Sequence, residues 1–247
     1  MGDGDPDAVV HAVFFDLDDT LFDHRSSARA ALADVHRRHA PAVDFTRFED
    51  YHSQHLEALH AEVLAGHLSI DDARRERFRR VFAAVGIAVD ADAVGRIAAA
   101  YRAGYVAARR VVEGAAALLE AVRPHARIAI VSNNLLDEQR DKLHFCGLAA
   151  LVDELVVSED VGVSKPDPGI FDAALGRLGV SAPHTVMFGD SWAADIVGAA
   201  RAGIRAVWFN PEGRPRPAEP PDITEVRALR PTDDLVRVLL GAPLPTR

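Results

Sequence analysis

Residues 12–22, AVFFDLDDTLF, place four apolar side chains directly before a cluster of aspartates. The apolar run ends at Phe15, and Asp16, Asp18 and Asp19 follow it. A short run rich in Phe and Val indicates a β-strand that is buried on both faces. Carboxylates that lie together repel one another unless a cation lies among them. The stretch therefore predicts either a strand that ends in a solvated turn or a strand that delivers carboxylates to a cation site.

Further apolar runs of the same kind follow later in the chain, and helical patterns alternate with them. Several of these helical patterns end at a glycine, which is a common helix stop. The predicted strands are residues 11–16, 127–132, 153–158, 184–189 and 205–210, and the helices between and after them are residues 114–122, 136–147, 168–179, 192–203 and 231–242. Alternation of strand and helix predicts an α/β fold with a parallel sheet.

The segment between the first two predicted strands is too long to be a simple connection. Helical patterns fill it at residues 26–40, 45–66, 69–86 and 90–109. A crossover between parallel strands needs only about a dozen residues. We therefore predict a core of residues 8–22 and 111–247 and an inserted helical subdomain of residues 23–110. Residues 1–7 are expected to be a disordered lead, and the proline-rich residues 211–221 a surface loop.

The composition is that of a soluble globular protein, with 49% hydrophobic and 26% charged residues among 247. No run approaches the ~18 apolar residues of a membrane span, and the N-terminus lacks a secretory pattern. A cytoplasmic location without a membrane partner is therefore expected. The net charge of −9 argues against a nucleic-acid partner. The single cysteine, Cys146, excludes an intrachain disulfide and is expected to be a small buried side chain.

Polar side chains of complementary chemistry follow the predicted strands. In an open α/β sheet, ligands bind beyond the carboxyl ends of the strands. The polar residues at these ends are Asp16, Asp18, Ser132, Lys165, Asp190 and Asp195. Oxygen ligands of this kind suit Mg²⁺, which takes one or two carboxylates plus substrate phosphate. A serine hydroxyl, backbone N–H groups and a lysine would bind phosphoryl oxygens. The set predicts phosphoryl transfer, which needs mainly positioning and charge neutralisation.

Four motifs in this order and spacing resemble the haloacid dehalogenase (HAD) superfamily. They are DLDDT at residues 16–20, VSNN at 131–134, SKPDP at 164–168 and GDSWAAD at 189–195. The resemblance covers the whole chain. It implies a Rossmann-like α/β core, a helical cap domain inserted after the first strand, and Mg²⁺ as the cofactor.

The resemblance also implies roles for the residues of the first three motifs. Asp16 would be the nucleophile that forms an aspartyl-phosphate. Asp18 would be the general acid that protonates the leaving oxygen and then the base that activates water. Thr20 would support the turn. Ser132 and Lys165 would hold the phosphoryl group, and Lys165 would also restrain Asp16.

The metal site implied by the resemblance is formed mainly by the first and fourth motifs. Asp190 would ligate Mg²⁺ together with the carboxylate of Asp16 and the backbone carbonyl of Asp18. Asp195 would be a further ligand or the partner of one. Asn133 is expected to be either a turn residue or a phosphate contact. Asp19 is expected only to cap or solvate the turn.

An aspartate two residues after the nucleophile, as at Asp18, favours a phosphatase or phosphomutase, since dehalogenases of this superfamily lack it. A β-phosphoglucomutase-like phosphomutase, a 2-haloacid dehalogenase and a non-catalytic binding protein remain alternatives. Residues 156–175 look most like the nucleotidase and sugar-phosphatase branches. This likeness implies a small phosphorylated metabolite as substrate, such as a nucleoside monophosphate or a sugar phosphate. The sequence leaves open whether the protein is a monomer or a homodimer.

Three histidines, His52, His55 and His60, share one predicted helix in the inserted segment. The spacing of His52 and His55 places them on one face, where two imidazoles can bind a metal. No HExxH motif accompanies them. A solvated polar face is therefore expected in preference to a metal site.

Overall fold

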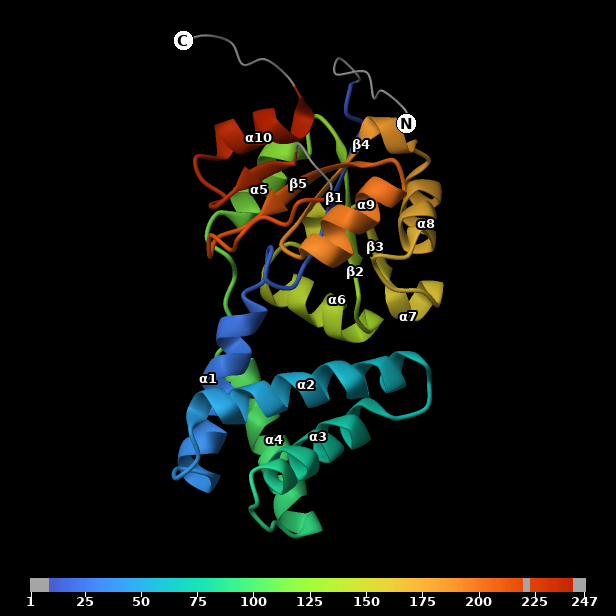
Figure 1. The fold of residues 1–247 in the computed structure, drawn as a ribbon. Helices are drawn as coiled ribbons and strands as arrows, with labels where there is room; N and C mark the ends of the chain where they lie inside the picture. The colour runs from blue at the N-terminus through green and yellow to red at the C-terminus, as the bar shows by residue number, and fades with distance from the viewer. Residues whose placement is uncertain (1–8, 220–222, 242–247) are drawn as a thin grey trace. The chain divides into compact units, whose positions relative to one another are not determined.

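The computed structural model describes residues 9–219 and 223–241, and the lead expected at residues 1–7 lies outside this part. The chain separates into two compact units, Met1–Phe22 together with Val111–Arg247, and Asp23–Arg110. The first unit contains the sheet, and the second is built from helices (Figure 1).

The described part of the first unit contains a parallel six-stranded sheet in the order β3-β2-β1-β4-β5-β6. The strands are β1 (Ala12–Phe15), β2 (Arg127–Ser132), β3 (Glu154–Val157), β4 (Thr185–Gly189), β5 (Arg205–Phe209) and β6 (Thr224–Val226). Strand β1 lies at the centre and is buried throughout. Its last residue, Phe15, pairs with Ile130 of β2 and Phe188 of β4. The chain segments that follow these strands therefore leave the sheet at one edge.

The parallel sheet confirms the predicted α/β fold. Five of the strands lie within the predicted runs. No predicted run corresponds to the sixth strand, β6. Strand β6 has only three residues, of which Thr224 is exposed and the other two are half-buried. It carries no apolar run, so its sequence contains no strand signal.

Helices cover both faces of the sheet. On one face, Phe14, Val131 and Met187 form a core with Phe171 of α8 and Ala199 of α9. On the other face, α5 and α10 contact each other, and they contact β2 and β4 respectively (Figure 1). The helices of this unit are α5 (Ala115–Val122), α6 (Leu136–Phe145), α7 (Ser158–Val161), α8 (Pro168–Leu178), α9 (Gly198–Arg201) and α10 (Thr232–Leu240), with 3-10 turns η1 (Ala149–Leu151) and η2 (Ala182–His184).

The helix predicted at residues 192–203 is not α-helical throughout. It begins as a π-helical turn, η3 (Trp192–Val197), and continues as α9. The N–H of Ile196 donates to the carbonyl of Ser191, five residues earlier, at 3.3 Å. A wide turn of this kind is rare and is frequent at functional sites. Here it lies in the segment that carries the fully buried Asp195.

Residues 23–110 form four helices at the positions of the predicted patterns. They are α1 (His24–His39), α2 (Phe45–Leu64), α3 (Ile70–Ala84) and α4 (Ala91–Ala107). Each begins after a side chain that accepts a hydrogen bond from the first turn, namely Asp23, Asp44, Ser69 and Asp90. Helix α1 packs on α4, and α2 packs on α3. In the part of the chain that the structure describes, no helix is long and apolar enough to cross a membrane.

The expectation of a solvated histidine face on α2 is wrong for His52. Its side chain is buried, with its ring 5.6 Å from the ring of Phe78 and 5.1 Å from that of Tyr101. His52 lies one turn after the buried Phe48, so it falls on the stripe of α2 that faces the other helices. Burial lowers the pKa of His52 well below its usual value, and the positive charge of Arg77 lowers it further.

This lowered pKa predicts a pH-dependent stability. Below the ordinary histidine pKa of 6.5, the unfolded chain takes up a proton at His52 while the folded chain does not. The free energy of unfolding should therefore decrease as the pH falls below that value, by up to about 1.4 kcal/mol per pH unit from this group. Above that value His52 should add no pH dependence. Urea unfolding of the wild type and of His52→Gln, at several pH values from neutral to mildly acidic, measures the difference in slope.

The control variant is His67→Asn, which removes a histidine whose side chain is 69% exposed. This variant should keep the slope of the wild type, whereas His52→Gln should show a shallower one. Equal slopes for the wild type and His52→Gln would contradict the prediction.

Candidate active site

Asp16 follows β1 directly, and its carboxylate is buried. The Asp16 N–H donates to the carbonyl of Phe188 in β4 at 3.0 Å, so the strand pairing extends to this residue. Thr20 Oγ1 donates to Asp16 Oδ2 at 3.1 Å and accepts from the N–H of Asp190 at 3.2 Å. Thr20 thus joins the turn after β1 to the end of β4. Asp19 turns the chain with a φ of 63°, a left-handed conformation that aspartate tolerates better than most residues.

Lys165 joins the aspartates of the first and fourth motifs. Its Nζ donates to Asp16 Oδ1 at 2.7 Å, to Asp195 Oδ1 at 2.6 Å and to the carbonyl of Val131 at 2.7 Å. These three acceptors match the three N–H donors of an ammonium group. The amide of Asn133 holds the backbone of Lys165, donating to its carbonyl at 2.8 Å and accepting from its N–H at 2.7 Å. The position of the ammonium group is therefore strongly determined.

Three buried carboxylates lie close together, and two of them pair with this lysine. Asp16, Asp190 and Asp195 each offer an oxygen, and these oxygens lie within 4.8 Å of one another. Burial raises the pKa of Asp16 well above its usual value. Lys165 opposes this rise, and the charges of Asp195 and Asp190 add to it. Burial lowers the pKa of Lys165, but Asp16 and Asp195 outweigh it and the net shift is upward. A buried, all-oxygen cluster of this kind fits a hard divalent cation.

The members of this cluster are not equivalent. Both oxygens of Asp195 already accept hydrogen bonds, Oδ1 from Lys165 and Oδ2 from the N–H of Ser191 at 2.9 Å. The chain approaches Asp195 closely at Gly189, where an added Cβ would lie 2.3 Å from Asp195 Oδ2. Only glycine leaves room for this contact. Asp195 is therefore built into the end of β4, with its carboxylate directed at Lys165.

Asp190 is held by a side chain that the sequence did not single out. Arg214 donates to the Asp190 carbonyl at 2.7 Å and to its Oδ2 at 3.2 Å. Trp208 Nε1 also donates to that carbonyl, at 2.9 Å. Arg214 belongs to the stretch 211–221, which was expected only to be a surface loop, and residues 220 and 221 of that stretch lie outside the described part. No local pattern marks this arginine, because its partner lies 24 residues away.

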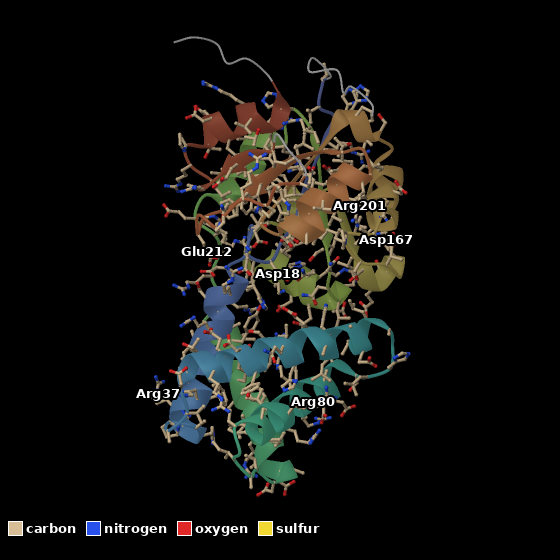
Figure 2. All side chains as sticks on the ribbon, in the orientation of Figure 1. Asp18, Arg37, Arg80, Asp167, Arg201 and Glu212 are labelled. Atoms are coloured by element: carbon tan, nitrogen blue, oxygen red, sulfur yellow. The ribbon has the colours of Figure 1, made fainter. Side chains whose placement is uncertain are left out.

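The carboxylate of Asp18 has a different set of partners. Lys142 Nζ donates to both of its oxygens, at 2.6 and 2.7 Å. Gln139 Nε2 and Asn134 Nδ2 donate to Asp18 Oδ2 at 3.1 and 3.2 Å. Asp18 is not a member of the three-aspartate cluster found in the described residues. Figure 2 labels Asp18, which belongs to the first unit. Its partner Lys142 lies on helix α6 of the same unit.

Ser132 ends β2 and is buried. Its Oγ accepts a hydrogen bond from Gln139 Nε2 at 2.5 Å. The structure therefore brings the predicted residues together in two connected groups. Asp16, Thr20, Lys165, Asp190 and Asp195 form one, and Asp18 and Ser132 form the other through Gln139. Sequence reasoning missed Gln139 and Lys142, although both lie in the predicted helix at residues 136–147.

The chain belongs to the family of haloacid dehalogenase-like hydrolases, whose model matches residues 10–203. This match confirms the family that the four motifs predicted. Among curated proteins, the chain is similar to the pyrimidine 5'-nucleotidase YjjG of Escherichia coli, with 40% identity over 42% of this chain. It is similar to the phosphoserine phosphatase of Thermus thermophilus, with 40% identity over 45% of this chain. The alignments cover 47% and 45% of these two relatives, so the chain spans about half of each.

A solved structure resembles the chain over nearly its whole length. It is the putative HAD-hydrolase YfnB from Bacillus subtilis, a structure bound to magnesium. The TM-score is 0.72 and the sequence identity 24%, with 94% of this chain and 99% of the other covered. This likeness shows the fold.

Proposed function

We propose that this protein is a Mg²⁺-dependent phosphatase that hydrolyses a small phosphomonoester through an aspartyl-phosphate. The observation that carries the proposal is the buried Asp16, held by Lys165 and Thr20, with a second carboxylate two residues later at Asp18. A nucleophile and an acid–base group thus lie on one turn. Residues 23–110 are proposed as the cap domain that the family resemblance implies.

The proposed metal site uses residues of the first and fourth motifs. The carboxylates of Asp16 and Asp190 and the backbone carbonyl of Asp18 would hold Mg²⁺, and Asp195 would position Asp16 through Lys165. When bound, the ion would neutralise charge on the phosphoryl oxygens. The donor set supports this proposal because it contains only oxygen atoms and lies among buried carboxylates.

In the first half-reaction, a carboxylate oxygen of Asp16 attacks phosphorus and the bond to the ester oxygen breaks. The Asp18 carboxyl gives its proton to the leaving oxygen, so an alcohol departs. The Ser132 hydroxyl and the Lys165 ammonium bind phosphoryl oxygens. The side-chain amide of Asn133 already holds Lys165. The backbone N–H of Asn133 is therefore the group proposed for a phosphate contact.

In the second half-reaction, the Asp18 carboxylate takes a proton from water as that water attacks the phosphorus of the aspartyl-phosphate. The bond between phosphorus and the Asp16 oxygen breaks, and inorganic phosphate leaves. Asp16 regains its carboxylate, and Asp18 regains the proton that it gave to the alcohol. The two half-reactions therefore balance to hydrolysis of one phosphoester bond.

The names of two relatives support a small phosphomonoester as the substrate. One relative is a pyrimidine 5'-nucleotidase and the other a phosphoserine phosphatase. Both names describe removal of phosphate from a small metabolite. Together with the likeness of residues 156–175 to nucleotidase and sugar-phosphatase sequences, they support a nucleoside monophosphate or sugar phosphate as the first substrates to test.

We expect chelation to abolish the activity. Purified protein should release inorganic phosphate from several members of a phosphomonoester panel in Mg²⁺, and an excess of EDTA should lower the rate at least roughly 100-fold, since a metal contributes several kcal/mol of charge stabilisation. Added Mg²⁺ should restore the rate. Undiminished turnover after chelation would contradict the metal assignment.

The same panel separates the alternatives. An isomerised phosphoester in place of free phosphate would identify a phosphomutase. Chloride release from 2-chloropropionate without metal would identify a dehalogenase. A failure to turn over any panel member would favour a non-catalytic protein on this fold.

A further inference from the structure

Lysine is scarce in this chain, and both of its lysines are buried beside the first motif. Of the 28 lysine and arginine residues, only Lys142 and Lys165 are lysines. Their side chains are 4% and 2% exposed. Lys165 pairs with Asp16, and Lys142 pairs with Asp18. The proposed function gives a role to Lys165 and none to Lys142.

Burial of an ammonium group is unfavourable by several kcal/mol unless a carboxylate and further hydrogen bonds compensate. Lys142 makes an ion pair with Asp18 and lies 5.4 Å from the centre of the Phe22 ring. A helix that only packed against the sheet would be served as well by an apolar side chain at this position. The buried charge therefore indicates a function for the ion pair.

Gln139 lies one helical turn before Lys142 on the same face of α6. It is fully buried, and its Nε2 donates to both Ser132 Oγ and Asp18 Oδ2. Gln139 therefore connects the end of β2 with the turn after β1. Through Gln139 and Lys142, helix α6 contacts the proposed phosphate-binding hydroxyl and the proposed acid–base carboxylate together.

The segment that follows β2 supports the Asp18 carboxylate. Its side chain is 23% exposed, and Asn134, Gln139 and Lys142, which follow β2, donate to it. A carboxylate that transfers a proton must lie within hydrogen-bond reach of the leaving oxygen. Hydrogen bonds from three side chains to its two oxygens restrict the rotation of the Asp18 carboxylate.

We propose that Lys142 and Gln139 are positioning residues that hold the Asp18 carboxylate and the Ser132 hydroxyl in the arrangement needed for proton transfer to the leaving oxygen. They act through Asp18 and Ser132. This role rests on the proposed function, in which Asp18 is the acid–base group.

The test compares two esters that differ in their need for a proton. The leaving group of p-nitrophenyl phosphate departs as a stable phenolate, whereas β-glycerophosphate must release an alcohol. In Lys142→Met, kcat/KM for β-glycerophosphate should fall about 100-fold or more, while that for p-nitrophenyl phosphate should fall less than about tenfold. Gln139→Met should change the ratio of the two values in the same direction. A loss of folded enzyme would lower both values equally, so the ratio isolates the positioning role.

The matched control is Arg140→Met, which removes a 59% exposed cation from the same helix and should leave both values unchanged. Thermal unfolding of each variant establishes that it is folded, and Gln139→Met provides the test if Lys142→Met does not fold. The same factor of loss on both esters, or no loss on either, would overturn the positioning role. A wild-type protein that hydrolyses neither ester would overturn the proposed function itself, and this role with it.

Discussion

Replacement of Asp16 by asparagine should lower kcat for every phosphomonoester by at least about 10⁴-fold, as loss of a nucleophile does in other enzymes. The amide cannot form the acyl-phosphate, yet it keeps an oxygen that accepts from Lys165 and the same side-chain size. The substitution also removes one negative charge from a cluster of three buried carboxylates. The variant should therefore fold, with a melting temperature no lower than that of the wild type. Steady-state phosphate release and thermal unfolding measure the two effects.

The control for this variant is Asp19→Asn in the same motif. Asparagine tolerates the left-handed backbone at this position, and Asp19 has no role in the proposed reaction. Its kcat should stay within about threefold of the wild type, because the side-chain size is kept and Asp19 is not a member of the three-aspartate cluster. Activity of Asp16→Asn above a tenth of the wild-type value would contradict the assignment of Asp16 as the nucleophile.

Replacement of Lys165 by methionine should destabilise the protein by about 3–5 kcal/mol, the usual effect of removing one partner from a buried ion pair. The change leaves the carboxylates of Asp16 and Asp195 buried without their shared cation. It also leaves the Val131 carbonyl without its donor from Nζ. The variant should also lose its phosphatase activity. Urea unfolding near neutral pH measures the loss of stability.

The sign of the pH dependence provides a second readout for Lys165→Met. Burial already raises the pKa of Asp16 in the wild type, and Lys165 opposes that rise. Without Lys165, the folded state should bind more protons than the unfolded state, so the free energy of unfolding should decrease as the pH rises through the acidic range. Addition of Asp195→Asn to Lys165→Met should recover part of the stability, because it removes one unpaired charge. Equal stability of Lys165→Met and the wild type would contradict this account.

Much of the fold and most of the candidate site could be predicted from local patterns. Apolar runs that end in polar residues indicate buried strands of a parallel sheet, and the four motifs indicate which strand ends carry functional side chains. Both signals depend on residues near one another in the chain. The structure supports the predicted proximity of these residues: Asp16 and Asp190 directly follow β1 and β4, and Lys165 pairs with Asp16.

Other features left no local signal. His52 has the polarity of a surface residue, and only the packing of α2 against Phe78 and Tyr101 shows that it is buried. Arg214 lies in a proline-rich loop, and its role depends on that loop lying over Asp190. The π-helical turn at Trp192–Val197 resembles an ordinary helix in composition, because the difference lies in a hydrogen bond and not in the residue types.

The stretch at residues 12–22 by itself determined a central buried strand followed by a turn rich in carboxylates. This is so because burial and charge repulsion depend on residue type and act between neighbours in the chain. Only the tertiary structure decided which cation each carboxylate meets. Asp16 meets Lys165 from 149 residues away and Asp18 meets Lys142 from 124 residues away. Such pairs form only when the strand order and the packing of α6 bring distant segments together, and no local pattern specifies them.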